Sequence, residues 1–223
     1  MSPLLPLGLV PLCCVFEALF LRSRDRGNHR AALALKSLAS LCFVALGLLS
    51  ARSVPGSLPV VLGLVFGMLG DQLLALRKLF PAHHDLTFIT GALSFSLGHF
   101  CYMAYLTETA EGMLLPAIPV FLVLAAGSEL FARYSGFSQG RMHLPGLLYI
   151  AIEAAMCALA LVRLWLAPGL SAVLFAAGGL LFLVSDNLLC AYSFGKMKTR
   201  AADRWLHITY IAAQLLIARS PAL

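Results

Sequence analysis

Charged residues are scarce in this sequence. Of its 223 residues, 12% are charged and 61% are hydrophobic, and the mean hydropathy is +0.90. A soluble globular domain carries about 25% charged residues, so the composition indicates a polytopic membrane protein instead. The chain also lacks a Gly-rich phosphate loop, a G-x-S-x-G elbow and an H-E-x-x-H pair, which excludes the common mechanisms of soluble hydrolases. Its six cysteines form no C-x-x-C pair and fall within apolar runs, as expected of packing residues.

Long apolar runs make up most of the chain. Each is about 20 residues long, enough for a helix to cross a hydrocarbon core of about 30 Å. Their continuity excludes the alternating pattern of a β-barrel. We therefore predict an all-α transmembrane bundle, with residues 1–223 forming one integral membrane domain. The eight predicted helices cover residues 3–21, 30–50, 58–76, 86–106, 113–132, 145–165, 169–193 and 204–219.

The basic residues are distributed unevenly between alternate connections. Twelve lie on one predicted side of the membrane: Arg22, Arg24, Arg26, Arg30, Arg77, Lys78, Arg133, Arg141, Lys196, Lys198, Arg200 and Arg204. The other side has only Arg52, Arg163 and Arg219. By the positive-inside rule the first side is cytosolic, so both termini are predicted to be non-cytosolic. The net charge of +6 then needs no nucleic-acid partner, and the short loops favour a bacterial inner membrane over the endoplasmic reticulum.

Two aspartates interrupt the apolar runs in a repeated context. Asp71 and Asp186 both lie in the pattern [Gly/Ser]-Asp-[Gln/Asn]-Leu-Leu, four predicted helices apart. A charged side chain at the centre of a membrane helix costs roughly 2.5–3.5 kcal/mol on insertion scales, so such residues are expected to serve a function. The repeat is also compatible with two four-helix halves related by a pseudo-twofold axis along the membrane normal.

Further polar residues are predicted at the depth of these aspartates. Lys36, Tyr210 and Gln214 share with them a layer about 9–15 Å below the cytosolic surface, at 1.5 Å per helical residue. Such a layer predicts a pocket that faces the cytosol. Two more features accompany it: a stripe of Gly63 and Gly67 that runs into Asp71, and a deeper polar stripe that contains His99 and Tyr102.

The same residues allow structural interpretations. Asp71 and Asp186 could simply neutralise Lys36, although one lysine cannot neutralise two carboxylates, so one of them is expected to hold or share a proton. Lys36 itself could equally bind a phosphate. Asp71, Asp186 and His99 could hold a metal ion, but the other histidines lie in loops or at helix ends, so we predict no metal and no cofactor. Glu17 is expected to reach water at the cytosolic end.

The polar motifs resemble those of the YhhN family, whose members cross the membrane eight times and include the vertebrate lysoplasmalogenases. The matching segments are Lys36-Ser37-Leu38, Gly70-Asp71-x-x-Leu74, His99-x-x-Tyr102, Tyr149 with Met156, Ser185-Asp186, and Thr209-Tyr210-x-x-Ala213-Gln214. Their order and spacing agree over residues 30–220. The chain departs from the family at Ser37, where a proline is common, and Glu153 belongs to no family motif.

The resemblance implies a hydrolase that cleaves the vinyl-ether bond of lysoplasmalogens, with a lysophospholipid substrate taken from membrane lipid. The two carboxyl groups suit this reaction, so Asp71 and Asp186 are predicted to be catalytic. Substrate-binding or orienting roles are predicted for Lys36, His99, Tyr102, Tyr210 and Gln214. A transporter or lipid carrier that uses the same buried charges is the main alternative, and a metal-dependent hydrolase of amides or esters is another. The oligomeric state is left open.

Overall fold

A computed structural model describes residues 4–77, 79–80, 82, 84–109, 112–140 and 142–223. Within these residues the chain forms eight α-helices, two short 3₁₀ helices and no β-strand. The α-helices are α1 (Leu4–Asp25), α2 (His29–Ala51), α3 (Leu58–Leu76), α4 (His84–Thr109), α5 (Leu114–Tyr134), α6 (His143–Leu166), α7 (Leu170–Phe194) and α8 (Arg200–Arg219). The 3₁₀ helices are η2 (Phe137–Gln139) and η3 (Ser220–Ala222). The predicted all-α class is confirmed.

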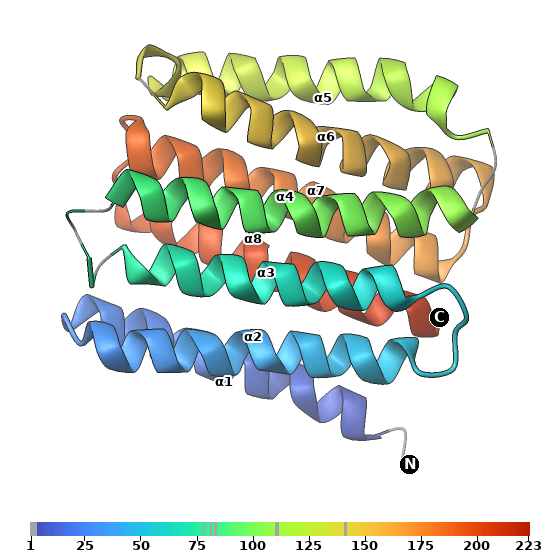
Figure 1. Ribbon diagram of the computed structural model, residues 1–223, viewed down its shortest axis with the longest axis horizontal. Coiled ribbons are helices and arrows are strands. Elements are labelled where there is room, and N and C mark those ends of the chain that lie inside the picture. The colour runs from blue at the N-terminus through green and yellow to red at the C-terminus, as the bar shows by residue number, and fades with distance from the viewer. Residues whose placement is uncertain (1–3, 78, 81, 83, 110–111, 141) are drawn as a thin grey trace.

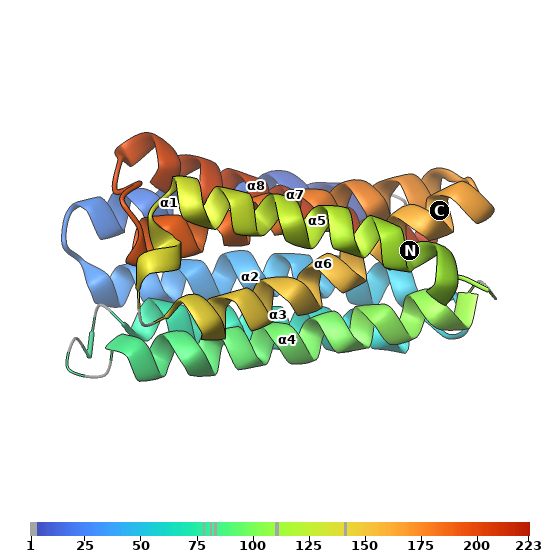
Figure 2. The same ribbon diagram turned by 90° about the horizontal axis from the view of Figure 1, so that it is seen from above.

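The helices run alternately up and down a single bundle (Figures 1 and 2). α1 begins and α8 ends at the same end of the bundle, on the right in Figure 1. The connections α1–α2, α3–α4, α5–α6 and α7–α8 lie at the opposite end, which we call the basic end because it carries the arginines and lysines predicted to be cytosolic. Of those twelve residues, Lys78 and Arg141 lie outside the described residues.

Six of the described helices, α2 to α7, are long and apolar enough to cross a membrane, as expected of an integral membrane protein. Large apolar side chains point outward from them, for example Leu115, Val123 and Trp165, where lipid would cover them. α5 is the most peripheral of the six, since it buries only Ala117, Ser128 and Ala132. That α1 and α8 also cross the membrane stays a prediction.

The helix contacts are compatible with a division into two four-helix halves, α1–α4 and α5–α8, although the halves are not equivalent because α8 also contacts α1 and α3. Consecutive helices pack together in each half, and the most extensive contacts between the halves are those of α2 with α8 and of α4 with α6. If each half is put in the place of the other, α2 takes the place of α6 and α8 that of α4, so the α2–α8 contact becomes the α4–α6 contact. The exchange also places Asp71 on α3 in the position of Asp186 on α7. That the chain consists of two related four-helix halves stays a prediction.

The connection between α1 and α2 is tighter than predicted. The predicted helices end at residue 21 and begin again at residue 30, but α1 continues through Asp25, α2 begins at His29, and only Arg26–Asn28 lie between them. Ion pairs to α8 hold this last helical turn: Arg24 contacts Asp203, and Arg204 contacts Asp25. α8 correspondingly begins at Arg200, capped by the Thr199 side chain, which accepts a hydrogen bond from the Ala202 N–H.

The predicted glycine stripe on α3 brings neighbouring helices close to it. A Cβ atom on Gly63 would overlap the Tyr102 ring of α4, and one on Gly67 would lie 2.5 Å from Gln214 Nε2 of α8. The two glycines therefore make room for two residues of the predicted site.

We expect Gly63→Ala to destabilise the protein by about 1–3 kcal/mol, because the Tyr102 ring must move to admit the methyl group. Gly127→Ala on α5 is the matched control, since nothing lies within 4 Å of the added Cβ. Removing a helical glycine there is expected to be neutral or to stabilise by about 1 kcal/mol. The measurement is thermal unfolding of the two variants in detergent, and equal midpoints would contradict the packing described here.

Candidate functional site

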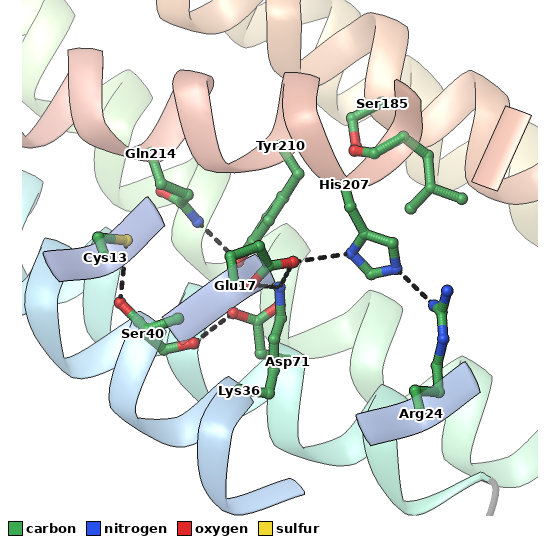
Figure 3. A network of polar contacts seen from close by, with 12 residues as sticks. Cys13, Glu17, Arg24, Lys36, Ser40, Asp71, Ser185, His207, Tyr210 and Gln214 are labelled. Atoms are coloured by element: carbon green, nitrogen blue, oxygen red, sulfur yellow. Dashed lines mark hydrogen bonds and ion pairs between the residues drawn. The ribbon is translucent and has the colours of Figure 1, made fainter. Parts of the chain in front are cut away.

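A buried cluster of charged side chains joins α1, α2 and α3 (Figure 3). Lys36 Nζ lies 3.1 Å from Glu17 Oε1 and 3.5 Å from Asp71 Oδ1. All three residues are at least 95% buried. A single ammonium group therefore serves two carboxylates away from bulk water, where an unpaired charge is costly. The structure places Lys36 against Asp71, as the structural interpretation expected, but brings Glu17 rather than Asp186 to its other side.

The prediction that Glu17 reaches water is wrong. Glu17 also faces His207, whose Nδ1 lies 3.0 Å from its Oε1, and His207 Nε2 lies 2.8 Å from Arg24 Nη1. A guanidinium only donates hydrogen bonds, so Nε2 of His207 must accept one and the ring proton sits on Nδ1, toward Glu17. Glu17 is held inside because the α1–α2 hairpin brings it to the depth of Lys36 (Figure 3).

Asp71 is surrounded by hydrogen-bond donors. Besides Lys36, Ser40 Oγ donates to its Oδ2 at 2.5 Å, and the Tyr210 hydroxyl donates to the same carboxylate. Tyr210 in turn accepts from Gln214 Nε2 at 3.1 Å, and Gln214 Oε1 accepts from the Tyr102 hydroxyl at 3.1 Å. The chain Tyr102–Gln214–Tyr210–Asp71 thus points its donors in one direction and ends on a carboxylate. These contacts favour the ionised form of Asp71.

Asp186 has different surroundings. The Tyr149 hydroxyl of α6 donates to its Oδ2. A second carboxyl, Glu153, and the imidazole of His99 lie so near that one ligand atom from each of the three residues falls within 4.8 Å of the others. Both oxygens of Glu153 and both ring nitrogens of His99 are buried and have no hydrogen-bond partner among the described residues. None of the ion pairs found in the described part of the chain includes Asp186 or Glu153.

This second group also has the composition of a small metal centre. One imidazole and two carboxylates are donors that zinc and other divalent ions accept. His99, Glu153 and Asp186 could therefore hold a divalent cation. The group predicted from the sequence, Asp71 with Asp186 and His99, differs in one member, because Asp71 is engaged by Lys36 and Glu153 takes its place.

A cavity of about 580 Å³ connects the two carboxyl groups with the basic end. Four of the predicted residues line it: Lys36, Asp71, Asp186 and Tyr210. His99, Tyr102 and Gln214 do not line it but lie buried behind its wall. Its mouth is formed by residues near the chain reversals of the basic end, namely Arg24, Asp25, His29, Arg77, Lys198, Arg200 and Asp203. The volume is typical of a ligand pocket, about 300–1,000 Å³.

Several side chains of the site were not predicted from the sequence. Glu17 was assigned to water, and Glu153, Ser40 and Tyr149 were given no role at Asp71 or Asp186. Helical spacing could have indicated them. In each half, the helix before the aspartate carries two polar residues at i and i+4, namely Lys36 and Ser40, and Tyr149 and Glu153. The exchange of the two halves places α2 where α6 lies, which makes these pairs counterparts.

Apolar outer faces around a pocket lined by ionisable side chains define an integral membrane protein with a buried polar site. The model of the YhhN family matches residues 31–221, so the chain belongs to the YhhN family. The match covers α2 from residue 31 onward, all of α3 to α8, and every predicted site residue. No match was found among curated proteins or among solved structures.

We expect Lys36→Met to destabilise the protein by about 3–5 kcal/mol, because it leaves Glu17 and Asp71 buried without a counter-ion. The double variant Lys36→Met/Glu17→Gln should recover part of this loss, since it leaves one buried carboxylate fewer. Lys196→Met, at an exposed lysine of the same end, is the control. Unfolding in detergent measures all three, and a Lys36→Met variant as stable as the control would show that the cluster contributes little.

Proposed function

We propose that this protein is a lysoplasmalogenase-like hydrolase that cleaves the vinyl-ether bond of alkenyl lysophospholipids. The products would be a fatty aldehyde and a glycerophospho-ethanolamine or -choline. The YhhN family is associated with hydrolase activity, and membership suggests a lysoplasmalogenase-like function. The observation that carries the proposal is that one pocket contains two carboxyl groups with opposite surroundings, Asp71 beside a lysine and Asp186 beside a second acid.

Vinyl-ether hydrolysis requires two such groups. The alkene carbon must be protonated, which produces an oxocarbenium ion that water then captures. An un-ionised carboxyl can supply the proton, and an ionised carboxylate can stabilise the cation and activate the water. Glycosidases divide the same tasks between two carboxyl groups around an oxocarbenium-like transition state. The reaction needs no serine nucleophile.

The surroundings of the two aspartates support a division of these roles. Asp71 faces Lys36 and accepts hydrogen bonds from Ser40 and Tyr210, all of which stabilise its charge, so it is the carboxylate. Asp186 has Glu153 beside it and no cationic partner among the described residues. Two carboxyls this close in a medium of low dielectric constant cannot both ionise. Only Asp186 of the pair lines the pocket, so we propose that Asp186 is the acid that passes the shared proton to the substrate, and that Glu153 keeps one proton on the pair.

The complete reaction returns both groups to their starting states. Asp186 gives its proton to the alkene carbon, and the resulting oxocarbenium ion takes up water as Asp71 accepts one water proton. This step forms a hemiacetal. Its carbon–oxygen bond to the glycerol then breaks: Asp71 protonates the departing glycerol oxygen, while Asp186 accepts the proton of the hemiacetal hydroxyl. One water is consumed, an aldehyde is released, and Asp186 is again protonated.

The deciding experiment compares an alkenyl lysophospholipid with its saturated alkyl analogue, using purified protein in detergent and measuring released fatty aldehyde. The proposal expects aldehyde from the alkenyl lipid alone. An intact, bound lipid in both cases would instead indicate a transporter or lipid carrier. The metal content of the same preparation, and its activity after chelation, test the metal-dependent alternative at His99, Glu153 and Asp186.

We expect Asp71→Asn and Asp186→Asn each to lower aldehyde release by at least about 10²–10⁴-fold, the usual contribution of a general acid or base. Glu129→Gln is the matched control, since this carboxylate pairs with Arg133 outside the pocket. Size-exclusion profiles establish that the variants stay folded. Turnover by both asparagine variants at the wild-type rate would refute the acid–base pair.

We expect Glu153→Gln to shift the alkaline limit of the activity to lower pH. Asp186 must keep its proton to act as the acid, and without a neighbouring carboxyl it ionises more readily. The variant should therefore lose activity at a pH where the wild type remains active, and approach wild-type rates at lower pH. A pH–rate profile makes the measurement, and a uniform loss of rate at every pH would assign Glu153 a packing role only.

A further inference from the structure

The mouth of the pocket contains three cations that form no ion pair with a carboxylate among the described residues. Arg77, Lys198 and Arg200 line it and form no ion pair within the described part of the chain. The two acids of the mouth are occupied, because Asp203 pairs with Arg24 and Asp25 pairs with Arg204. The mouth thus carries an excess of positive charge at the place where the pocket opens.

Arg77 is the most enclosed of the three. Arg77 follows the end of α3 and contacts two uncharged groups among the described residues: Nη1 donates to Ser193 Oγ at 3.3 Å, and the guanidinium carbon lies 5.6 Å from the centre of the Phe88 ring. Burial lowers the pKa of the Arg77 guanidinium below its usual value, so these neighbours do not replace the hydration it has lost. An anion beside Arg77 would make up for that loss.

The same helix carries Arg77 and the proposed base. Arg77 follows Asp71 by six residues, which places it about 9 Å farther along α3 toward the basic end. In a lysoplasmalogen, seven bonds separate the phosphorus from the alkene carbon that is protonated. Three single bonds span roughly 3.3–3.6 Å when extended, so seven span roughly 8 Å. A phosphate held at Arg77 would place the vinyl ether beside Asp71 and Asp186.

We propose that Arg77, with Lys198 and Arg200, forms the binding site for the phosphate of the lysophospholipid headgroup. The chemistry suits the ligand, since a guanidinium binds two phosphate oxygens at once and the two exposed cations add charge around it. Lys36 is less suited to that task, because Glu17 and Asp71 already surround its ammonium group. This inference rests on the proposed function for the identity of the lipid.

The test measures binding, so that it does not depend on turnover. Purified full-length protein is titrated with a saturated alkyl lysophosphoethanolamine, which has no vinyl ether to cleave, and with the matching alkylglycerol, which has no phosphate. The wild type should prefer the lysophospholipid. Arg77→Gln should reduce that preference by about 10–100-fold, the equivalent of one charge-assisted interaction of 1.5–3 kcal/mol. The preference of Arg77→Lys for the lysophospholipid should lie between those of the wild type and Arg77→Gln, because lysine keeps the charge without the bidentate geometry.

Arg133→Gln is the control, since this exposed arginine of the basic end does not line the pocket. Alkylglycerol binding monitors the fold, and a loss of affinity for both lipids would overturn the proposal by assigning Arg77 a structural role. An unchanged preference in Arg77→Gln would overturn it too, even in a protein that releases aldehyde. Titration with inorganic phosphate tests whether the site binds a free anion instead of a lipid headgroup. If phosphate binding depends on Arg77 but lysophospholipid binding does not, the lipid site is refuted as well.

Discussion

The buried ammonium group of Lys36 is the interaction on which the rest of the site depends. It lies between Glu17 and Asp71, and so ties α1 and α3 to α2 at the depth of the pocket. Glu17 extends the connection through His207 to Arg24 and α8. Without the lysine, two carboxylates would be left in a medium where an unpaired charge is costly. The same lysine stabilises the negative charge of Asp71, so one ion pair contributes both to the packing of the helices and to the proposed chemistry.

The two halves of the bundle share a scaffold but differ in charge. In each half an aspartate on the third helix meets an i, i+4 pair on the second: Lys36 and Ser40 at Asp71, Tyr149 and Glu153 at Asp186. The eighth helix delivers Tyr210 to the first aspartate, and the fourth delivers His99 to the second. Where one half has a cation, the other has an acid. Similar arrangements of helices therefore place two carboxyl groups with different surroundings on the same cavity, which two halves of identical sequence could not do.

Much of the fold follows from the sequence because lipid imposes a simple rule. Apolar runs of membrane length must be helical, and the helices begin and end within about one turn of their predicted bounds. Depth along a helix also follows from residue number, which is why Lys36, Asp71, Asp186 and Tyr210 were expected at one level and do line one cavity. A single sequence does not show which way each side chain points around its helix axis, or which helices pack against one another. Glu17 and Glu153 show the limit: each is polar within an apolar run, but only the packing of α1 on α2 and of α4 on α6 reveals which residues they face.

The position of the pocket explains how a hydrolase could act on a molecule that is mostly hydrocarbon. Arg77, Lys198 and Arg200, which form no ion pair among the described residues, lie at the mouth of the pocket, and the carboxyl groups of Asp71 and Asp186 lie deeper. A lysophospholipid has the same order along its length, with an anionic headgroup followed by glycerol and then an apolar chain. Binding the phosphate at the mouth would fix how far the lipid enters, and the fixed depth would select the bond presented to Asp71 and Asp186. Selectivity for the vinyl-ether bond would then come from the distance between Arg77 and Asp71 along α3, and not from recognition of the hydrocarbon chain of the lipid.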